Sequence, residues 1–250
     1  MLYVGIVEDS APALELRAPP NGASRLPPDV IQAAIAFSDA HMRAIMRGRA
    51  GEDISEGHSL MADSAARMAQ LAFVPLAAKH LDTLRKVLRT SSDPDHRSLA
   101  ALVLPYAANK QSIVADLVYA MRDPASDVRN NATRALWILA VYAQKHPELK
   151  ITVPYEPFID LLNSLAWTDR NKSSLALMAL TESRDPALLS ALRTRAFDSL
   201  VDIAQWTNPG HAMAGVAILG RMAGIPEQEI YAMYDRGERD KIIDAARNAK

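Results

Sequence analysis

The sequence has no cysteine, few aromatic residues, no excess of charge and no long apolar run. Without cysteine there is no disulfide framework, no thiolate metal site and no cysteine nucleophile. The apolar runs are far shorter than the ~18 residues that a membrane helix needs. The first residues also lack the basic flank of a signal peptide. We therefore expect a cytoplasmic protein with no role in a membrane.

The charges nearly cancel, because 28 basic residues stand against 29 acidic residues. A protein that binds duplex nucleic acid usually needs an excess of basic residues to neutralise the phosphates. The charge balance therefore argues against nucleic acid as a partner. Aromatic residues make up 6% of the chain and hydrophobic residues 49%, so small aliphatic side chains must build most of the core. Such a core suits closely stacked helices, and few segments alternate as strands do.

One unit recurs along the chain: an acidic or Asn/Pro turn followed by an alanine-rich helix. Its clearest copy spans residues 123–136, and looser copies begin at Asp93, Thr168 and Thr207. An Asp or Asn in the turn can cap the helix, and Pro in the first turn costs no backbone hydrogen bond. Recurrence every few tens of residues predicts a solenoid of stacked helices.

The helix of the clearest copy has one apolar face, formed by Val128, Ala132, Ala135, Leu136 and Leu139. These positions are spaced by three or four residues and therefore lie on one side of a helix. Alanine in the middle of such a stripe lets neighbouring helices approach closely. We predict that this face forms the core.

The chain divides by composition at residue 27. Residues 1–27 are punctuated by prolines and are predicted to form a flexible or extended arm, followed by a single helical domain over residues 28–250. We expect about five helix pairs and then C-terminal helices. The first two helices are predicted at Val30–Arg47 and Ser55–Ala72. The later pairs are predicted at 76–89 with 94–108, 110–122 with 126–145, 155–167 with 170–182, and 187–206 with 210–223.

The Asp-Pro turn, the Val-Arg that follows it and the alanine-rich second helix resemble HEAT repeats, in particular the short bacterial kind. The resemblance is most specific over residues 110–145. It implies an all-α fold, an α-α superhelix whose second helices line a concave surface that binds a protein or peptide. It implies no cofactor, and we expect no catalytic activity. Later copies depart from the pattern, since Ser173 and Ala212 replace the arginine found at Arg129.

Asn130, Arg134 and Trp137 share the helix face opposite the predicted core stripe. The resemblance would place this face in the concave surface. Trp beside Arg has the composition of an interaction hot spot. Alternatively, Trp137 packs against the adjacent repeat and Arg134 pairs with a neighbouring acid.

A second candidate is a basic strip along the same surface, to which Arg97, Arg129 and Lys172 would contribute, with His211 as a polar residue beside it. These side chains either bind an acidic peptide or phosphate, or pair locally with acids of the turns. The six histidines are not spaced as metal ligands, so we expect no metal site.

Two other kinds of protein with HEAT-like repeats provide alternatives. HEAT-like alkylpurine DNA glycosylases use a cationic groove with aromatic residues and a carboxylate, for which Trp137, Trp206 and Asp169 would be the candidates. Phycobilin lyases share short HEAT-like repeats, and this alternative depends on fold analogy alone. We prefer a non-enzymatic binding scaffold, because the charges are even and no acid–base cluster is apparent.

Overall fold

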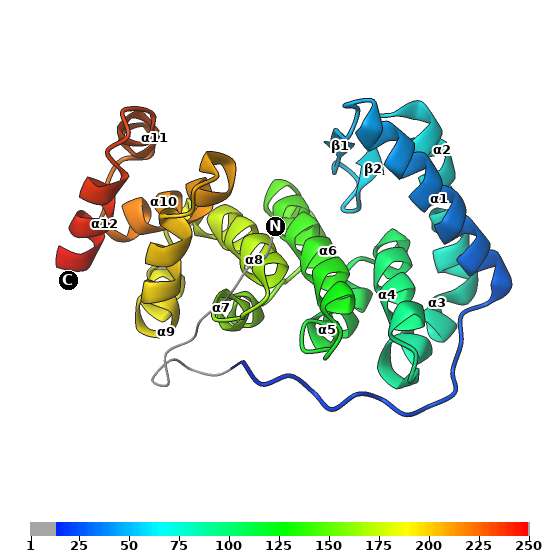
Figure 1. Ribbon diagram of the computed structural model, residues 1–250. Coiled ribbons are helices and arrows are strands. Elements are labelled where there is room, and N and C mark those ends of the chain that lie inside the picture. The colour runs from blue at the N-terminus through cyan, green and yellow to red at the C-terminus, as the bar shows by residue number, and fades with distance from the viewer. Residues whose placement is uncertain (1–13, 250) are drawn as a thin grey trace. The chain divides into compact units, whose positions relative to one another are not determined.

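The computed structural model describes residues 14–249, most of which lie in helices (Figure 1). The chain divides into two compact units, which we call the N-terminal unit (Leu16–Val153) and the C-terminal unit, described here from Pro154 to Ala249. We describe each unit by itself. The expected single domain over residues 28–250 stays a prediction.

The N-terminal unit contains an extended arm, helices and one small hairpin. Its elements are α1 (Pro28–Met46), β1 (Glu52–Asp53), β2 (Leu60–Met61), α2 (Ser64–Leu71), α3 (Phe73–Thr90), α4 (Pro94–Val103), η1 (Leu104–Tyr106), α5 (Gln111–Ala120), α6 (Ser126–Lys145) and η2 (Pro147–Leu149).

Helices α3 and α4 form one pair of this unit, and α5 and α6 form the next. The second helices, α4 and α6, pack side by side (Figure 1). Helix α6 has the predicted bounds, and all five residues of its predicted apolar stripe are at most 5% exposed. The predicted helix pairing and core face are confirmed here, because turn and periodicity agree with each other.

The predicted helix over Ser55–Ala72 is wrong in its first half. Residues 52–61 form an antiparallel hairpin in which Glu52 pairs with Met61, and α2 begins only at Ser64. Gly57 has a φ of +68°, a conformation that a helix does not contain and that other residues rarely adopt. Asp63 then caps α2 by accepting hydrogen bonds from two backbone N–H groups.

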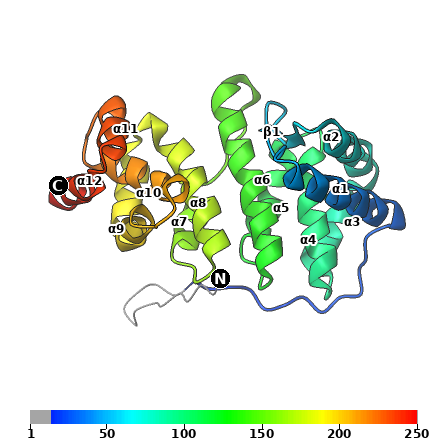
Figure 2. The same cartoon turned by 45° about the horizontal axis from the view of Figure 1, so that its top comes forward.

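Within the N-terminal unit, residues 16–27 of the arm are extended and lie against the turns that precede α4 and α6 (Figures 1 and 2). Gly22 donates from its backbone N–H to the Thr90 carbonyl and accepts from Ser92, both at 2.8 Å. A Cβ at Gly22 would lie 2.4 Å from the Thr90 oxygen, so only glycine fits. Farther toward the N-terminus, the Arg17 guanidinium lies 3.2 Å from the centre of the Tyr119 ring. Residues 1–13 lie outside the described residues.

The C-terminal unit is also built of helix pairs. Its elements are α7 (Glu156–Leu162), α8 (Trp167–Leu180), η3 (Thr181–Ser183), α9 (Pro186–Ala204), α10 (Pro209–Met222), α11 (Glu227–Asp235) and α12 (Arg239–Asn248). Helix α7 packs on α8 and α9 on α10, while α11 and α12 both contact α10. Trp167 begins α8, although we predicted it at the end of the preceding helix. Asn208 caps α10, as the turn pattern predicts.

Candidate functional site

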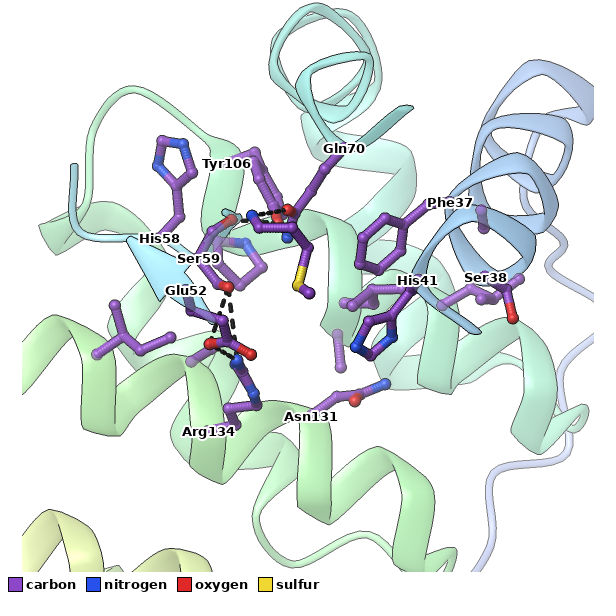
Figure 3. A pocket seen from close by; sticks show the side chains of 18 of the residues that line it. Phe37, Ser38, His41, Glu52, His58, Ser59, Gln70, Tyr106, Asn131 and Arg134 are labelled. Atoms are coloured by element: carbon purple, nitrogen blue, oxygen red, sulfur yellow. Dashed lines mark hydrogen bonds and ion pairs between the residues drawn. The ribbon is translucent and has the colours of Figure 1, made fainter. Parts of the chain in front are cut away.

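The N-terminal unit encloses a cavity of about 350 Å³. Its walls come from α1, the hairpin, α2, α4, η1 and α6, so it lies where the first helices and the hairpin meet the second helices α4 and α6. Most of the lining is apolar. Figure 3 shows Arg134 and the hairpin on one side and α1 on the opposite side. The volume and composition are those of a ligand pocket.

The hairpin is held over α6 by its turn and by an ion pair. A Cβ at Gly57 would lie 2.8 Å from the Tyr142 ring, so the turn packs closely on α6. Asp53 accepts a hydrogen bond from the Ser55 backbone and pairs with Arg67 at 3.1 Å, and these bonds lower the Asp53 pKa to about 2. The hairpin is thus fixed at both ends.

One wall of the cavity is a chain of satisfied hydrogen bonds. Gln70 accepts from the Met61 backbone at 2.7 Å and donates to the Tyr106 hydroxyl at 2.5 Å. Tyr106 in turn donates to the Ser59 carbonyl at 2.8 Å. Burial raises the pKa of Tyr106 far above its ordinary value, so its hydroxyl remains protonated. A complete network of this kind makes the wall rigid.

The charged pair of the cavity is formed by Glu52 of the hairpin and Arg134 of α6. The Nη2 atom of Arg134 donates to Glu52 Oε2 and lies 3.4 Å from the Ser59 hydroxyl. Ser59 itself donates to the same carboxylate oxygen at 3.1 Å (Figure 3). The side chains of Arg134 and Glu52 are 24% and 28% exposed. This pair is net neutral and accessible.

Helix α1 contributes an aromatic wall. The rings of Phe37 and His41 are stacked at 5.4 Å between centroids and 6° between planes. Phe37 also contacts Phe73 edge-to-face at 5.5 Å, which anchors the stack in the core. The imidazole of His41 has no hydrogen-bond partner among the described residues. It can therefore donate to or accept from a bound molecule.

Of the residues singled out from the sequence, Asn130 and Arg134 come together as part of the cavity wall. Arg134 forms an ion pair with Glu52 of the hairpin. This agrees with the alternative in which Arg134 pairs with a neighbouring acid. The Oδ1 atom of Asn130 is buried and has no hydrogen-bond partner among the described residues. Trp137 is half-buried on the same helix and does not line the cavity.

Arg97 and Arg129 do not lie on an open surface, so their predicted place in an exposed basic strip is wrong. Arg97 is 2% exposed and makes two hydrogen bonds to the fully buried Asp123 carboxylate, at 2.8 and 2.9 Å. Arg129 is 4% exposed and donates to the Asp123 carbonyl at 2.8 Å. Arg97 joins two consecutive turns, because it also donates to the Ser91 carbonyl at 2.8 Å, whereas Arg129 donates to carbonyls of the turn before its own helix.

Lys172 and His211 belong to the C-terminal unit, where both are half-buried on α8 and α10. The His211 ring contacts Trp167 edge-to-face at 4.9 Å. Trp167 and Trp206 also contact each other, with centroids 6.2 Å apart. These aromatic residues pack across the turn between repeats, as their sequence position suggests.

Sequence reasoning missed much of the cavity, including Glu52, His41 and Tyr106. A second cavity, of about 470 Å³, was missed as well. It is lined in part by Lys110, which donates to the Pro105 carbonyl at 2.7 Å and lies 3.0 Å from His58 Nδ1. Burial lowers the pKa of Lys110 to about 8 and, together with the Lys110 charge, that of His58 to about 4. The available signal was the group of charged residues Glu52, Asp53 and Glu56 in the segment 52–61.

Residues 14–249 contain no cluster of three or more histidine or acidic side chains that could hold a metal ion. In the same range, no helix is long and apolar enough to cross a membrane.

Comparisons with known proteins support the repeat assignment. A family model of HEAT repeats matches residues 81–149. Among solved structures, the chain is similar to one described as a computationally designed armadillo repeat protein for modular peptide recognition, with 16% identity and a TM-score of 0.48. That match covers 89% of this chain and 98% of the other. No curated protein matches the chain. The match over residues 81–149, which contain α4, α5 and α6, shows that this stretch of the chain consists of HEAT-like repeats.

Proposed function

We propose that the protein is a non-enzymatic scaffold that binds a protein or peptide partner. The observation that carries this proposal is a set of exposed apolar side chains on α1, α2 and the first turn of α3. We call it the α1–α2 patch, and it consists of Ile35, Met42, Ile45, Met46, Met68, Leu71 and Val74. These are seven of the eleven exposed large apolar side chains among the described residues, so the exposed apolar side chains are concentrated rather than scattered.

The exposure within the patch is high, at 81% for Met46 and 74% for Met68. On α1, Ile35, Met42 and Met46 are spaced by seven and four residues and therefore form one stripe along the helix. The terminal helices of a stack of repeats usually have a polar outer face, and the apolar stripe of α1 differs from this. Concentrated apolar side chains mark protein contacts, and methionine adapts its shape to a partner.

The face of α6 that carries Asn130, Arg134 and Trp137 remains part of the proposed binding surface. Lys172 and His211 stay proposals for the C-terminal unit. A bacterial source and a cytoplasmic setting, which the HEAT-like resemblance and the lack of cysteine support, also belong to this proposal.

The alternative of a DNA repair enzyme has no favouring observation among the described residues. Its carboxylate candidate, Asp169, is fully buried at the start of α8 and accepts a hydrogen bond from Ser164 at 2.6 Å. Its aromatic candidate Trp206 contacts Trp167 and Arg170. Both are thus used for packing within the C-terminal unit.

The test is a quantitative cross-linking pull-down from cell lysate with four baits. These are the wild type, the patch variant Met42→Gln/Met46→Gln, the face variant Arg134→Ala/Trp137→Ala, and the control Leu165→Gln. Leu165 is 62% exposed in the C-terminal unit and matches the patch residues in kind. We expect wild type and control to retain the same protein and the patch variant to lose it.

The remaining outcomes are also informative. A face variant that loses the partner would place Arg134 and Trp137 in the contact. Identical profiles from all four baits would reject both surfaces. The molar masses of the wild type and the patch variant are also compared by light scattering. If the patch variant retains the same lysate proteins but has a lower molar mass than the wild type, the patch binds a second copy of this chain. That result would overturn the proposal of a foreign partner.

A further inference from the structure

The cavity of the N-terminal unit is built as a site for a small molecule, separately from the exposed α1–α2 patch. Its volume of about 350 Å³ is at the lower end of known ligand sites and is more than enough for a single substituted ring. Its walls come from α1, the hairpin, α2, α4, η1 and α6, which lie in distant parts of the chain. The side chains that line the cavity indicate which class of ligand it can bind.

The apolar part of the cavity favours a ring. Phe37 and His41 form a stacked pair on one wall, and Tyr106 closes another. Met61 fills the space beside them with a flexible thioether. Aromatic faces and edges of this kind attract a planar ligand more specifically than an aliphatic one.

The polar end of the cavity offers a donor and an acceptor side by side. Arg134 uses Nη2 for its bonds to Glu52 and Ser59, whereas Nε and Nη1 form no hydrogen bond among the described residues. Glu52 uses Oε2, and its Oε1 is likewise without a bond there. A ligand carbonyl can therefore accept from Arg134 while a ligand N–H donates to Glu52.

The net charge of this end decides against an ionic ligand. Arg134 and Glu52 cancel each other, so a carboxylate bound to Arg134 would lie beside the like charge of Glu52, and an ammonium bound to Glu52 would lie beside the like charge of Arg134. In either case, the repulsion offsets the attraction. A group that is neutral and carries both functions keeps the pair intact.

We propose that this cavity binds a small uncharged ring compound that carries a carboxamide or lactam group, held by Arg134 and Glu52. The imidazole of His41 on the opposite wall adds one hydrogen bond to a ring heteroatom. This site is independent of a protein partner on the α1–α2 patch, so either can fail without the other.

The experiment titrates the full chain with three probes of one shape, namely benzamide, benzoate and benzylamine, by NMR line shape and calorimetry at pH 7.5. We expect benzamide to bind with a dissociation constant of about a millimolar, since it has few atoms. We expect the two charged probes to bind about tenfold more weakly or not at all.

Three variants locate the site. Arg134→Met and Glu52→Met should each weaken benzamide binding by about tenfold or more, because one of the two hydrogen bonds is lost. Ser38→Trp should block the cavity from α1, and since Ser38 is exposed, it should leave the unfolding midpoint unchanged. Arg43→Met, at an exposed arginine of α1 outside the cavity, is the matched control.

Two results overturn the proposal. One is equal or tighter binding of benzoate or benzylamine, which would mean that the ion pair does not select a neutral amide. The other is benzamide binding that survives in Ser38→Trp or is absent in the folded wild type. The pull-down of the scaffold proposal is unaffected by any of these outcomes.

Discussion

Removal of the Asp123 carboxylate is the change that we expect to destabilise the N-terminal unit most. Asp123 is fully buried between the two helix pairs and makes two hydrogen bonds to Arg97. Its Oδ1 also accepts from the Ala125 N–H at 2.9 Å, which satisfies a donor just before α6. Arg17 of the arm lies 3.9 Å away. One carboxylate therefore holds a turn, a neighbouring repeat and the arm.

The magnitude follows from what Asp123→Ala leaves behind. Arg97 is 2% exposed, so its charge would remain buried without a carboxylate, and breaking a buried pair in this way costs about 3–5 kcal/mol. For a unit of this size, that corresponds to a fall in melting temperature of about 10 °C or more. Arg97→Met should cost less, because the Asp123 carboxylate keeps the Ala125 N–H and the nearby Arg17.

The assay is urea unfolding followed by circular dichroism, with hydrogen exchange of peptides from α4 and α6 to assign the loss to the N-terminal unit. The double variant Arg97→Met/Asp123→Ala completes a thermodynamic cycle, and we expect its loss to be well below the sum of the single losses. Arg236→Met is the control, because Arg236 forms only exposed ion pairs in the C-terminal unit. Its unfolding midpoint should not change.

Two results would refute this reasoning. If the single losses add in the double variant, the two side chains do not act as a pair. If Asp123→Ala costs less than about 1 kcal/mol, water or Arg129 compensates for the carboxylate and the ion pair does not hold the repeats together.

Three further predictions concern packing, titration and the arm. Ala132→Leu should overpack the buried face of α6 and cost about 1–3 kcal/mol, measured by urea unfolding, since Ala132 is 0% exposed; an unchanged midpoint would contradict that core face. The folded-state pKa of Lys110, about 8, lies below its ordinary value of 10.5, so the unfolded chain binds more protons between these pH values. Stability should therefore rise as pH increases above 8, and Lys110→Met should remove most of this rise between pH 8 and about 9.5, before tyrosines titrate. Limited proteolysis should spare residues 16–26 in the wild type and cut them in Gly22→Val, because the added side chain cannot fit against the Thr90 carbonyl; equal cutting in both proteins would mean that the arm is not docked.

The repeat helices could be predicted from the sequence because several local signals agree there. In the stretch that becomes α6, an acidic Pro turn precedes apolar residues spaced by three and four. Apolar periodicity, helix propensity and burial then favour the same segment, and no distant residue is needed to decide between alternatives. The prediction of α6 was therefore correct at both ends.

The hairpin over residues 52–61 could not be predicted in the same way. Its strands have two residues each, too few for alternation to be visible. The positive φ of Gly57 is stabilised by contacts with Tyr142, some 85 residues later in the chain. Glu52 finds its partner Arg134 at a similar separation. A cavity made from such distant contacts leaves no local pattern.

The arginines show why spacing alone misjudged part of the site. Arg97 and Arg129 recur at equivalent positions of two repeats, and the sequence is compatible with an exposed strip as well as with buried pairs. Only the positions of the side-chain tips distinguish these cases. In the structure, the tips meet Asp123, which the sequence indicated only as a turn acid.

The same contrast indicates where selective binding can arise in this protein. Arg97 and Arg129 recur between repeats, and their side chains are occupied by hydrogen bonds to the turn at Asp123. Such residues stabilise the stack of repeats. Arg134 does not recur, and its partner Glu52 comes from a segment that interrupts the helical pattern. An irregular segment laid against a regular one creates a cavity whose groups are not all paired within the fold. The accessible polar atoms of Arg134, Glu52 and His41 are therefore a better guide to function than the repeat that surrounds them.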